Sequence, residues 1–146
     1  MKALIQRVKR AQVEVDNKTV GTIQQGLLVF IGVEKTDTQE KADKLLKKIL
    51  NYRIFSDVND KMNLSLLDIT GELLLVSQFT LVADTQKGLR PSFSSAADPI
   101  MSKDLYHYMI KQAHTCGLKI QTGIFAADMQ VSLINDGPVT FNLQSQ

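Results

Sequence analysis

Apolar and polar residues alternate along several short stretches of the chain, as they do in strands that are buried on one face. The alternating stretches are residues 3–8, 12–15 and 19–23. Residues 27–33 are instead continuously apolar, which predicts a strand buried on both faces. Residues 72–82 form a second strongly apolar strand candidate, so the pattern predicts a fold rich in strands.

Helical spacing of apolar residues follows the capping residues at positions 36–39. The side chains expected to face inward are Ala42, Leu45, Leu46, Ile49 and Leu50. The opposite side carries four lysines, Lys41, Lys44, Lys47 and Lys48. These lysines and Arg7 are candidate phosphate contacts, but a solvated face is the favoured interpretation of the lysines because lysine-rich exposed helices are common.

The C-terminal half predicts one more helix and a β-hairpin. Ser102 is expected to cap the helix and Gly117 to end it, with inward side chains Leu105, Tyr106, Met109, Ile110 and Ala113. Residues 130–134 and 139–143 alternate on either side of the sequence NDGP, which is typical of a tight hairpin turn. Together these elements predict a single α+β domain over residues 1–146. Its strand-rich mixed or antiparallel sheet would form a barrel-like core with two main helices.

Composition excludes several classes of function but identifies none. The chain has 146 residues and a formal net charge of +2, which permits an RNA partner without indicating one. The single cysteine, Cys116, allows no intramolecular disulfide. No apolar run approaches the length of a membrane span, and the N-terminal residues do not resemble a signal peptide, so a cytoplasmic protein is expected.

Residues with the usual catalytic chemistry are sparse. His107 and His114 lie seven positions apart, about two helical turns, which is too far for a shared metal ion without a third ligand. The glycines lack the spacing of a phosphate-binding loop, and the carboxylates form no recognisable acid–base pair. No metal and no cofactor are therefore expected, and these patterns alone indicate only a small enzyme or binding domain.

Two local features depart from the general pattern. Ser77, Gln78 and Thr80 interrupt a strand that is otherwise suited to burial. Their polar groups either satisfy one another or line a pocket with donors directed at an oxyanion. The second feature is Pro138 after Gly137, because proline is awkward in a paired strand unless it lies at an edge or a bulge.

The sequences SQFTL at residues 77–81 and NDGPVT at residues 135–140 resemble the two signature motifs of the D-aminoacyl-tRNA deacylases of bacteria and eukaryotes. The similarity spans essentially the whole chain, with further agreement at residues 6–8, 52–55, 61–63, 90–93, 122–123 and 125–129. The Ser-Gln opening of the first motif favours this branch over the related deacylase that removes mischarged L-alanine.

The resemblance implies hydrolysis of the ester bond between a D-amino acid and the 3′ end of a tRNA, as a chiral proofreading step. It also implies a homodimer in which Gly137 and Pro138, joined by a cis peptide, reach into the partner's site. An L-residue would drive its Cβ into this backbone, whereas a D-residue would point its side chain outward. Glycyl-tRNA, which has no side chain, is expected to be hydrolysed slowly.

The chemical step has two open alternatives. Thr80 is a candidate nucleophile, although no base lies next to it in sequence. The favoured alternative is a water molecule activated by the 2′-hydroxyl of the terminal adenosine, with Ser77 and Gln78 holding the oxyanion or carbonyl. The adenine is expected to bind near Phe79, Phe125 and Met129, for which core packing is an equal alternative.

Two other classes of function stay open. The first is a small esterase that acts without tRNA. The second is a non-catalytic RNA-binding module, which the weak charge and the absence of RNP, KH or zinc motifs disfavour.

Overall fold

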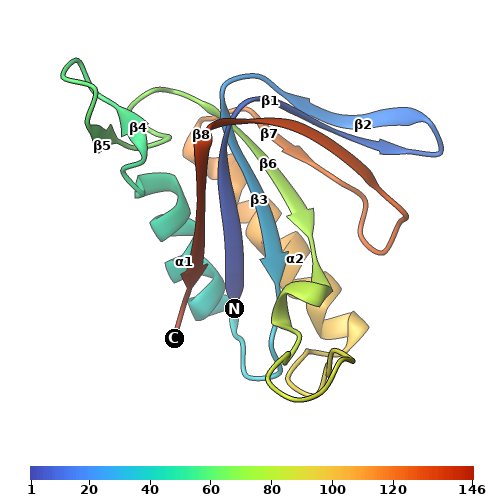
Figure 1. The fold of residues 1–146 in the computed structure, drawn as a ribbon. Coiled ribbons are helices and arrows are strands. Elements are labelled where there is room, and N and C mark those ends of the chain that lie inside the picture. The colour runs from blue at the N-terminus through green and yellow to red at the C-terminus, as the bar shows by residue number, and fades with distance from the viewer.

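A strongly curved sheet of six strands forms the centre of the molecule (Figure 1). The computed structural model describes residues 1–146. β1 is antiparallel to β2, β3 and β8, whereas β3, β6 and β7 run parallel. The short strands β4 and β5 form a separate pair. The bounds are Lys2–Val15 (β1), Lys18–Ile23 (β2), Gly26–Gly32 (β3), Phe55–Ser56 (β4), Met62–Leu64 (β5), Glu72–Ser77 (β6), Ile120–Thr122 (β7) and Gln130–Gln144 (β8).

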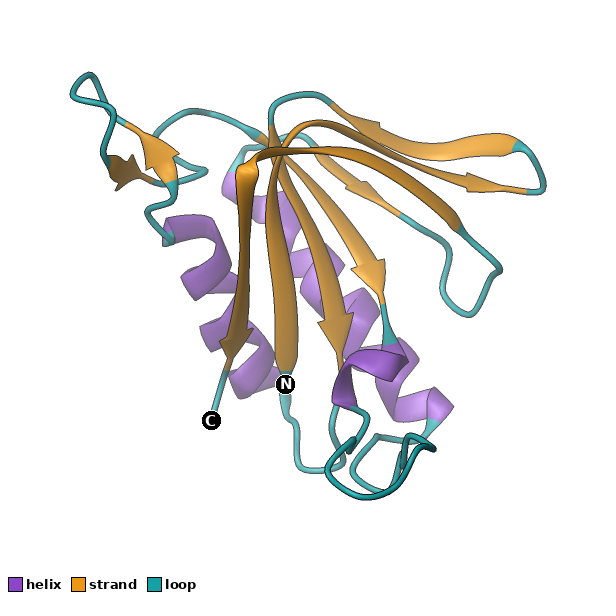
Figure 2. Ribbon diagram, in the orientation of Figure 1, coloured by secondary structure: helices purple, strands orange, loops and turns teal.

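Two helices, α1 (Gln39–Asn51) and α2 (Pro99–Ala113), cover the same face of the sheet (Figure 2). The hydroxyl of Thr38 accepts a hydrogen bond from the N–H of Lys41 at 3.3 Å and caps α1. All five apolar side chains predicted to face inward from α1 are buried, and they join the main core between the helices and the sheet. Neither helix combines the length and the apolar character needed to cross a membrane.

The other face of the sheet curls around a second, smaller core. Its buried members are Val8, Ala11, Val13, Ile23, Leu28, Leu74 and Val76. Half-buried apolar side chains pack against them, among them Phe30, Met129 and Val131. The curvature is visible in Figure 1, where β8 arches over the sheet. The predicted α+β fold, with a barrel-like mixed sheet and two main helices, is confirmed.

The start of α2 differs from the prediction. Asp98, not Ser102, is the N-cap, and its carboxylate accepts a hydrogen bond from the N–H of Met101 at 2.9 Å. Pro99 occupies the first turn, where its missing N–H costs nothing and its fixed φ suits a helix. Of the predicted inward side chains all are buried except Ile110, which is half-buried, and Gly117 ends a short 3₁₀ turn, η2 (His114–Cys116), that extends α2.

The predicted C-terminal hairpin is wrong. Residues 130–134 and 139–143 both belong to β8, which pairs with β1 on both sides of an unpaired segment. Val8 pairs with Asn135 and Gln6 with Thr140, so the residues between them form a bulge opposite Arg7. The strand does not reverse at Gly137, because β1 continues past the bulge and offers partners to both halves. The two strands predicted at residues 3–8 and 12–15 are likewise one strand, β1.

The strand predicted over residues 72–82 ends early, at Ser77, and a 3₁₀ turn, η1 (Phe79–Val82), follows. The N–H of Gln78 still donates to the carbonyl of Ile31 at 2.7 Å, but β3 ends at the next residue, Gly32. A Cβ at Gly32 would lie 2.7 Å from Val82 Cγ1 and 3.3 Å from the Gln78 carbonyl oxygen. Glycine therefore lets η1 fold back over the end of β3.

Candidate active site

A cavity of about 500 Å³ opens where β6 ends. η1, the start of α2 and the segment that joins β7 to β8 enclose it. Most of its lining is hydrophobic. The structure brings together at this cavity five of the residues predicted for the site: Ser77, Gln78, Phe79, Phe125 and Met129.

The polar side of the cavity is built by the change from β6 to η1. The side-chain amide of Gln78 donates to the hydroxyl of Thr80 at 2.5 Å. The carbonyls of Gln78 and Thr80 accept hydrogen bonds inside the turn, from Leu81 at 3.2 Å and Ala83 at 3.1 Å. The N–H groups of Phe79 and Thr80 begin η1 and donate to no acceptor in the chain. Such free backbone donors beside polar side chains are suited to binding an oxyanion.

No ionisable side chain lines this cavity. The hydroxyl of Thr80 has Gln78 as its side-chain partner, and an amide cannot accept its proton. Tyr106 lies behind the wall, where its hydroxyl donates to the carbonyl of Leu75 at 2.8 Å, and burial raises the pKa of Tyr106 far above its usual value. The site can therefore orient groups and stabilise negative charge, but its own side chains supply no base.

The apolar wall opposite is held from behind by packing. Phe125 is half-buried, and its ring centroid lies 6.0 Å from that of Tyr106 and 6.3 Å from that of His107. Gly123 leaves room for Met129, since a Cβ there would lie 2.5 Å from the Met129 sulfur. Phe125 and Met129 thus serve the core and the cavity at once, so packing and base binding do not exclude one another.

Gly137 and Pro138 do not line this cavity. They are exposed, and the peptide bond between them is cis. Strand pairing aligns Arg7 with Leu27, whereas Ser77 pairs with Ile31. Four residues along the strands and three strand spacings across the sheet put the two motifs on the order of 20 Å apart within one chain.

The bulge that carries Gly137 and Pro138 is fixed from inside. Arg7, a candidate phosphate contact, instead donates to the carbonyls of Asp136 at 2.9 Å and Ile54 at 2.7 Å. Asn135 accepts from the N–H of Val139 at 2.8 Å and donates to the hydroxyl of Thr140 at 2.8 Å. Neither support was predicted from the sequence, although asparagine two residues before a glycine is a common turn-forming residue.

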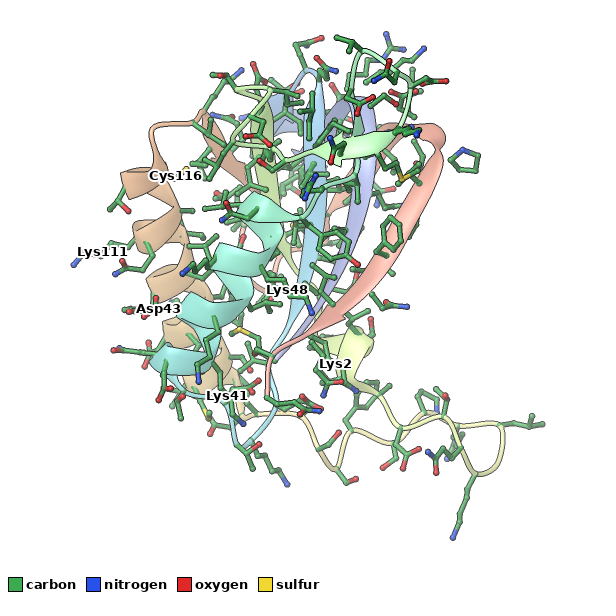
Figure 3. All side chains as sticks on the ribbon, turned by 90° about the vertical axis from the view of Figure 1, so that its left-hand side faces the viewer. Lys2, Lys41, Asp43, Lys48, Lys111 and Cys116 are labelled. Atoms are coloured by element: carbon green, nitrogen blue, oxygen red, sulfur yellow. The ribbon has the colours of Figure 1, made fainter.

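None of the four lysines of α1 lines the cavity, and Figure 3 shows two of them, Lys41 and Lys48, on the helix. Lys44 pairs with Glu40 at 2.7 Å, and Lys41 donates to the Thr36 carbonyl at 2.9 Å. Lys44 holds the pKa of the Glu40 carboxyl below its usual value. Lys41 also lies 3.9 Å from the carboxylate of Asp37, and acidic partners for two of the four lysines favour a solvated surface over a phosphate site.

The chain matches the family model described as D-Tyr-tRNA(Tyr) deacylase over residues 4–144. It is 65% identical over 143 residues to the D-aminoacyl-tRNA deacylase of Pseudoalteromonas translucida (strain TAC 125), which covers 98% of this chain and 99% of the relative. The D-aminoacyl-tRNA deacylase of Haemophilus influenzae (strain PittEE) is 64% identical over 141 residues, or 97% of each chain.

Solved structures agree with this result. The c-Myc DNA Unwinding Element Binding Protein superimposes with a TM-score of 0.94 at 38% identity, over 100% of this chain and 99% of the other. A probable eukaryotic D-amino acid tRNA deacylase superimposes with a TM-score of 0.86 at 16% identity over 97% of each chain, a likeness that shows the fold alone.

The relatives define the chain as an enzyme, a carboxylic ester hydrolase. It belongs to the family of the D-aminoacyl-tRNA deacylases, as the resemblance of residues 77–81 and 135–140 to the family's motifs predicts. The first motif lies at the cavity and the second at the exposed bulge, so each has a defined place in the fold.

Proposed function

We propose that the enzyme hydrolyses the ester of D-aminoacyl-tRNA, releasing the D-amino acid and free tRNA, and that it rejects L-aminoacyl-tRNA. The observation that carries the proposal is the cavity at Ser77 and Gln78, which no ionisable side chain lines. Free backbone N–H groups stand beside it, on Phe79, which lines the cavity, and on Thr80, which is exposed and follows it in η1. Such a site suits a substrate that brings its own catalytic hydroxyl. Because the substrate is an aminoacyl-tRNA, the cytoplasm is its proposed compartment.

The terminal adenosine is the part of the substrate proposed to fill the cavity. A volume of about 500 Å³ with a largely apolar lining suits a nucleoside. Phe125 and Met129 supply a flat, apolar wall for the adenine, because bases stack readily on such side chains. This places the ester carbonyl toward Gln78 and the free N–H groups of Phe79 and Thr80.

Water is the proposed nucleophile. It attacks the ester carbonyl carbon while the 2′-hydroxyl of the adenosine orients it and relays its proton, and the N–H groups of Phe79 and Thr80 stabilise the resulting oxyanion. Collapse of this intermediate breaks the bond to the 3′ oxygen, which takes up the proton. The carboxylic acid and the 3′-hydroxyl of the tRNA are the products. Thr80 then acts by holding Gln78 and offering its N–H, not by attacking the ester.

Selection of the D-isomer is assigned to a homodimer in which Gly137 and Pro138 of one subunit close the cavity of the other. Both residues are exposed and lie on the order of 20 Å from Ser77 by strand geometry, so they are out of reach of the cavity in their own chain. Backbone carbonyls directed at the substrate's amino group would leave no room for the Cβ of an L-residue. The D-side chain points outward, which predicts breadth across D-amino acids.

Paired hydrolysis of D- and L-tyrosyl-tRNA by the purified enzyme tests this proposal. We expect release of D-tyrosine to exceed that of L-tyrosine by at least a hundredfold, since the clash excludes one isomer outright. Equal release of both isomers would refute the chiral mechanism. Turnover of a free D-tyrosine ester as fast as the tRNA substrate would instead support the small esterase, and tRNA binding without release would support the RNA-binding module.

A further inference from the structure

An exposed aromatic pair lies at the mouth of the cavity. Phe79 is 61% exposed and Phe93 is 37% exposed, which is unusual for large apolar rings. Their ring centroids are 5.1 Å apart with the planes tilted by 49°. Phe79 also lines the cavity, so the pair extends an apolar surface from the cavity to the outside. The proposed reaction uses the cavity and leaves Phe93 without a role.

The loop that carries Phe93 comprises residues 83–98, between η1 and α2. Hydrogen bonds hold its base, and its tip is exposed to solvent. Asp84 and Ser92 exchange two backbone hydrogen bonds of 2.8 and 3.0 Å. Below them the hydroxyl of Ser95 donates to the Val82 carbonyl at 3.0 Å, which ties the loop to η1. The whole loop projects beyond the sheet and helices, as Figure 3 shows. The backbone therefore sets the place of Phe93 beside Phe79.

Two cations of this loop have no acidic partner within ion-pair distance. Lys87 and Arg90 are exposed and take part in no ion pair. The loop also holds two carboxylates, and each is held in place by a backbone donor: Asp84 accepts from the N–H of Gln86 and Asp98 from that of Met101, each at 2.9 Å. A phosphate can therefore pair with either cation, and both cations lie on the same loop as Phe93.

We propose that the Phe79–Phe93 pair, with Lys87 and Arg90, forms a second subsite that binds the unpaired cytidines preceding the terminal adenosine of the tRNA. The inference rests on the proposed function, which puts the adenosine in the adjoining cavity. Single-stranded RNA is recognised by stacking on aromatic rings and by cations on its phosphates, and this surface offers both. A strand leaving the cavity past Phe79 meets Phe93 next.

Substrates of graded length test the stacking part. Wild-type enzyme is given the D-tyrosyl ester of adenosine alone and of the trinucleotide CCA. We expect the added cytidines to lower KM about tenfold or more, as one stacked base does. Phe93→Ala should abolish this advantage and leave KM for the adenosine ester unchanged, whereas Phe93→Tyr, which keeps a ring, should retain it.

Salt dependence tests the charged part. The logarithm of KM for the trinucleotide ester should rise with the logarithm of salt concentration, by about 0.7 for each phosphate contact on a single strand. Replacing Lys87 and Arg90 together by alanine should lower this slope by about 1.4. The matched control replaces Lys47 and Lys48 on the exposed face of α1 and should leave the slope unchanged.

Binding of unesterified CCA, measured by calorimetry, separates the two proposals. Wild-type binding that Phe93→Ala weakens about tenfold supports the subsite even if no ester is hydrolysed, an outcome that would refute the proposed function instead. The subsite is overturned if CCA binds no better than adenosine, or if Phe93→Ala weakens both ligands equally. Equal weakening would mean that Phe93 only supports the fold or serves another partner.

Discussion

The guanidinium of Arg7 donates to the backbone carbonyl of Asp136 at 2.9 Å, directly beneath the bulge that carries Gly137 and Pro138. A second bond to the carbonyl of Ile54, at 2.7 Å, fixes the other side of the guanidinium. Arg7 is largely buried, with only 13% of its side chain exposed. The exposed turn proposed to select the D-isomer is therefore supported by a buried arginine of the neighbouring strand.

Arg7→Met should lower the ratio of D- to L-tyrosine release in a protein that still folds. Loss of these hydrogen bonds from a charged donor predicts a free energy of unfolding lower by about 2 kcal/mol. The freed bulge should admit L-tyrosyl-tRNA, so the ratio of D- to L-tyrosine release should fall at least tenfold. Urea unfolding and paired hydrolysis measure the two effects. Lys9→Met, an exposed position on the same strand, is the control and should change neither. An unchanged ratio in Arg7→Met would contradict the supporting role.

Gly32→Ala should disable the site through η1. The new Cβ would approach Val82 Cγ1 to 2.7 Å and the Gln78 carbonyl oxygen to 3.3 Å, so η1 must move. Such overpacking costs about 1–3 kcal/mol. Displacement of the Phe79 and Thr80 donors should lower kcat about a hundredfold, with little change in KM. Normal kcat in a folded variant would show that η1 does not bind the oxyanion. Val58→Ala, at a fully exposed side chain, serves as the control.

The sequence predicted most elements because each has a local signature. Helix α1 needs only its capping threonine and five apolar residues at helical spacing, and all of them behave as expected. The prediction for β8 was wrong because the residue types of the sequence NDGP are those of a hairpin turn. Whether such a segment turns back or bulges depends on the partner strand, and β1 is long enough to pair with both sides of it.

In the candidate site, too, local features could be predicted from the sequence and long-range features could not. The polar residues that interrupt an apolar strand left two alternatives open, mutual hydrogen bonding or the lining of a pocket. Both are present, because Gln78 donates to Thr80 while Ser77 and Gln78 line the cavity. The separation of Gly137 from this pocket follows from strand register, which no local pattern reveals. The support from Arg7 could not be predicted for the same reason, since Arg7 contacts residues distant in sequence.

Thr80→Val should retain much of the activity. The proposed oxyanion donor at residue 80 is its backbone N–H, which valine keeps, and the hydroxyl contributes only its bond to Gln78. We expect kcat for D-tyrosyl-tRNA to fall no more than about tenfold, the effect of one supporting hydrogen bond. A substrate ending in 2′-deoxyadenosine should react at least a thousandfold more slowly, because the hydroxyl that activates water is missing. The opposite ranking would make Thr80 the nucleophile.

The buried hydroxyl of Tyr106 should make the free energy of unfolding fall at alkaline pH. Burial raises the pKa of its hydroxyl above the usual value of about 10, so the unfolded state loses this proton first as pH rises. The stabilisation is full below pH 10 and declines above it as the unfolded state ionises. Denaturant unfolding from pH 8 to 11 should show this decline in wild type and less of it in Tyr106→Phe. That variant should also lose about 1 kcal/mol at neutral pH, because the hydrogen bond from the Tyr106 hydroxyl to the carbonyl of Leu75 is lost, although the N–H of Gly123 still donates to that carbonyl at 3.1 Å. Tyr52→Phe, at a half-exposed tyrosine, is the control.

Glycyl-tRNA distinguishes exclusion by shape from recognition of the D-side chain. The proposed gate of Gly137 and Pro138 rejects an L-residue only through its Cβ, which glycine lacks, so glycine should pass. Hydrolysis of D-alanyl-, glycyl- and L-alanyl-tRNA compares three substrates that differ by one methyl group. We expect release of D-alanine and glycine, with glycine the slower, and at least a hundredfold less release of L-alanine. Resistance of glycyl-tRNA equal to that of L-alanyl-tRNA would mean that the enzyme selects by binding the D-side chain, and the gate would have to be abandoned.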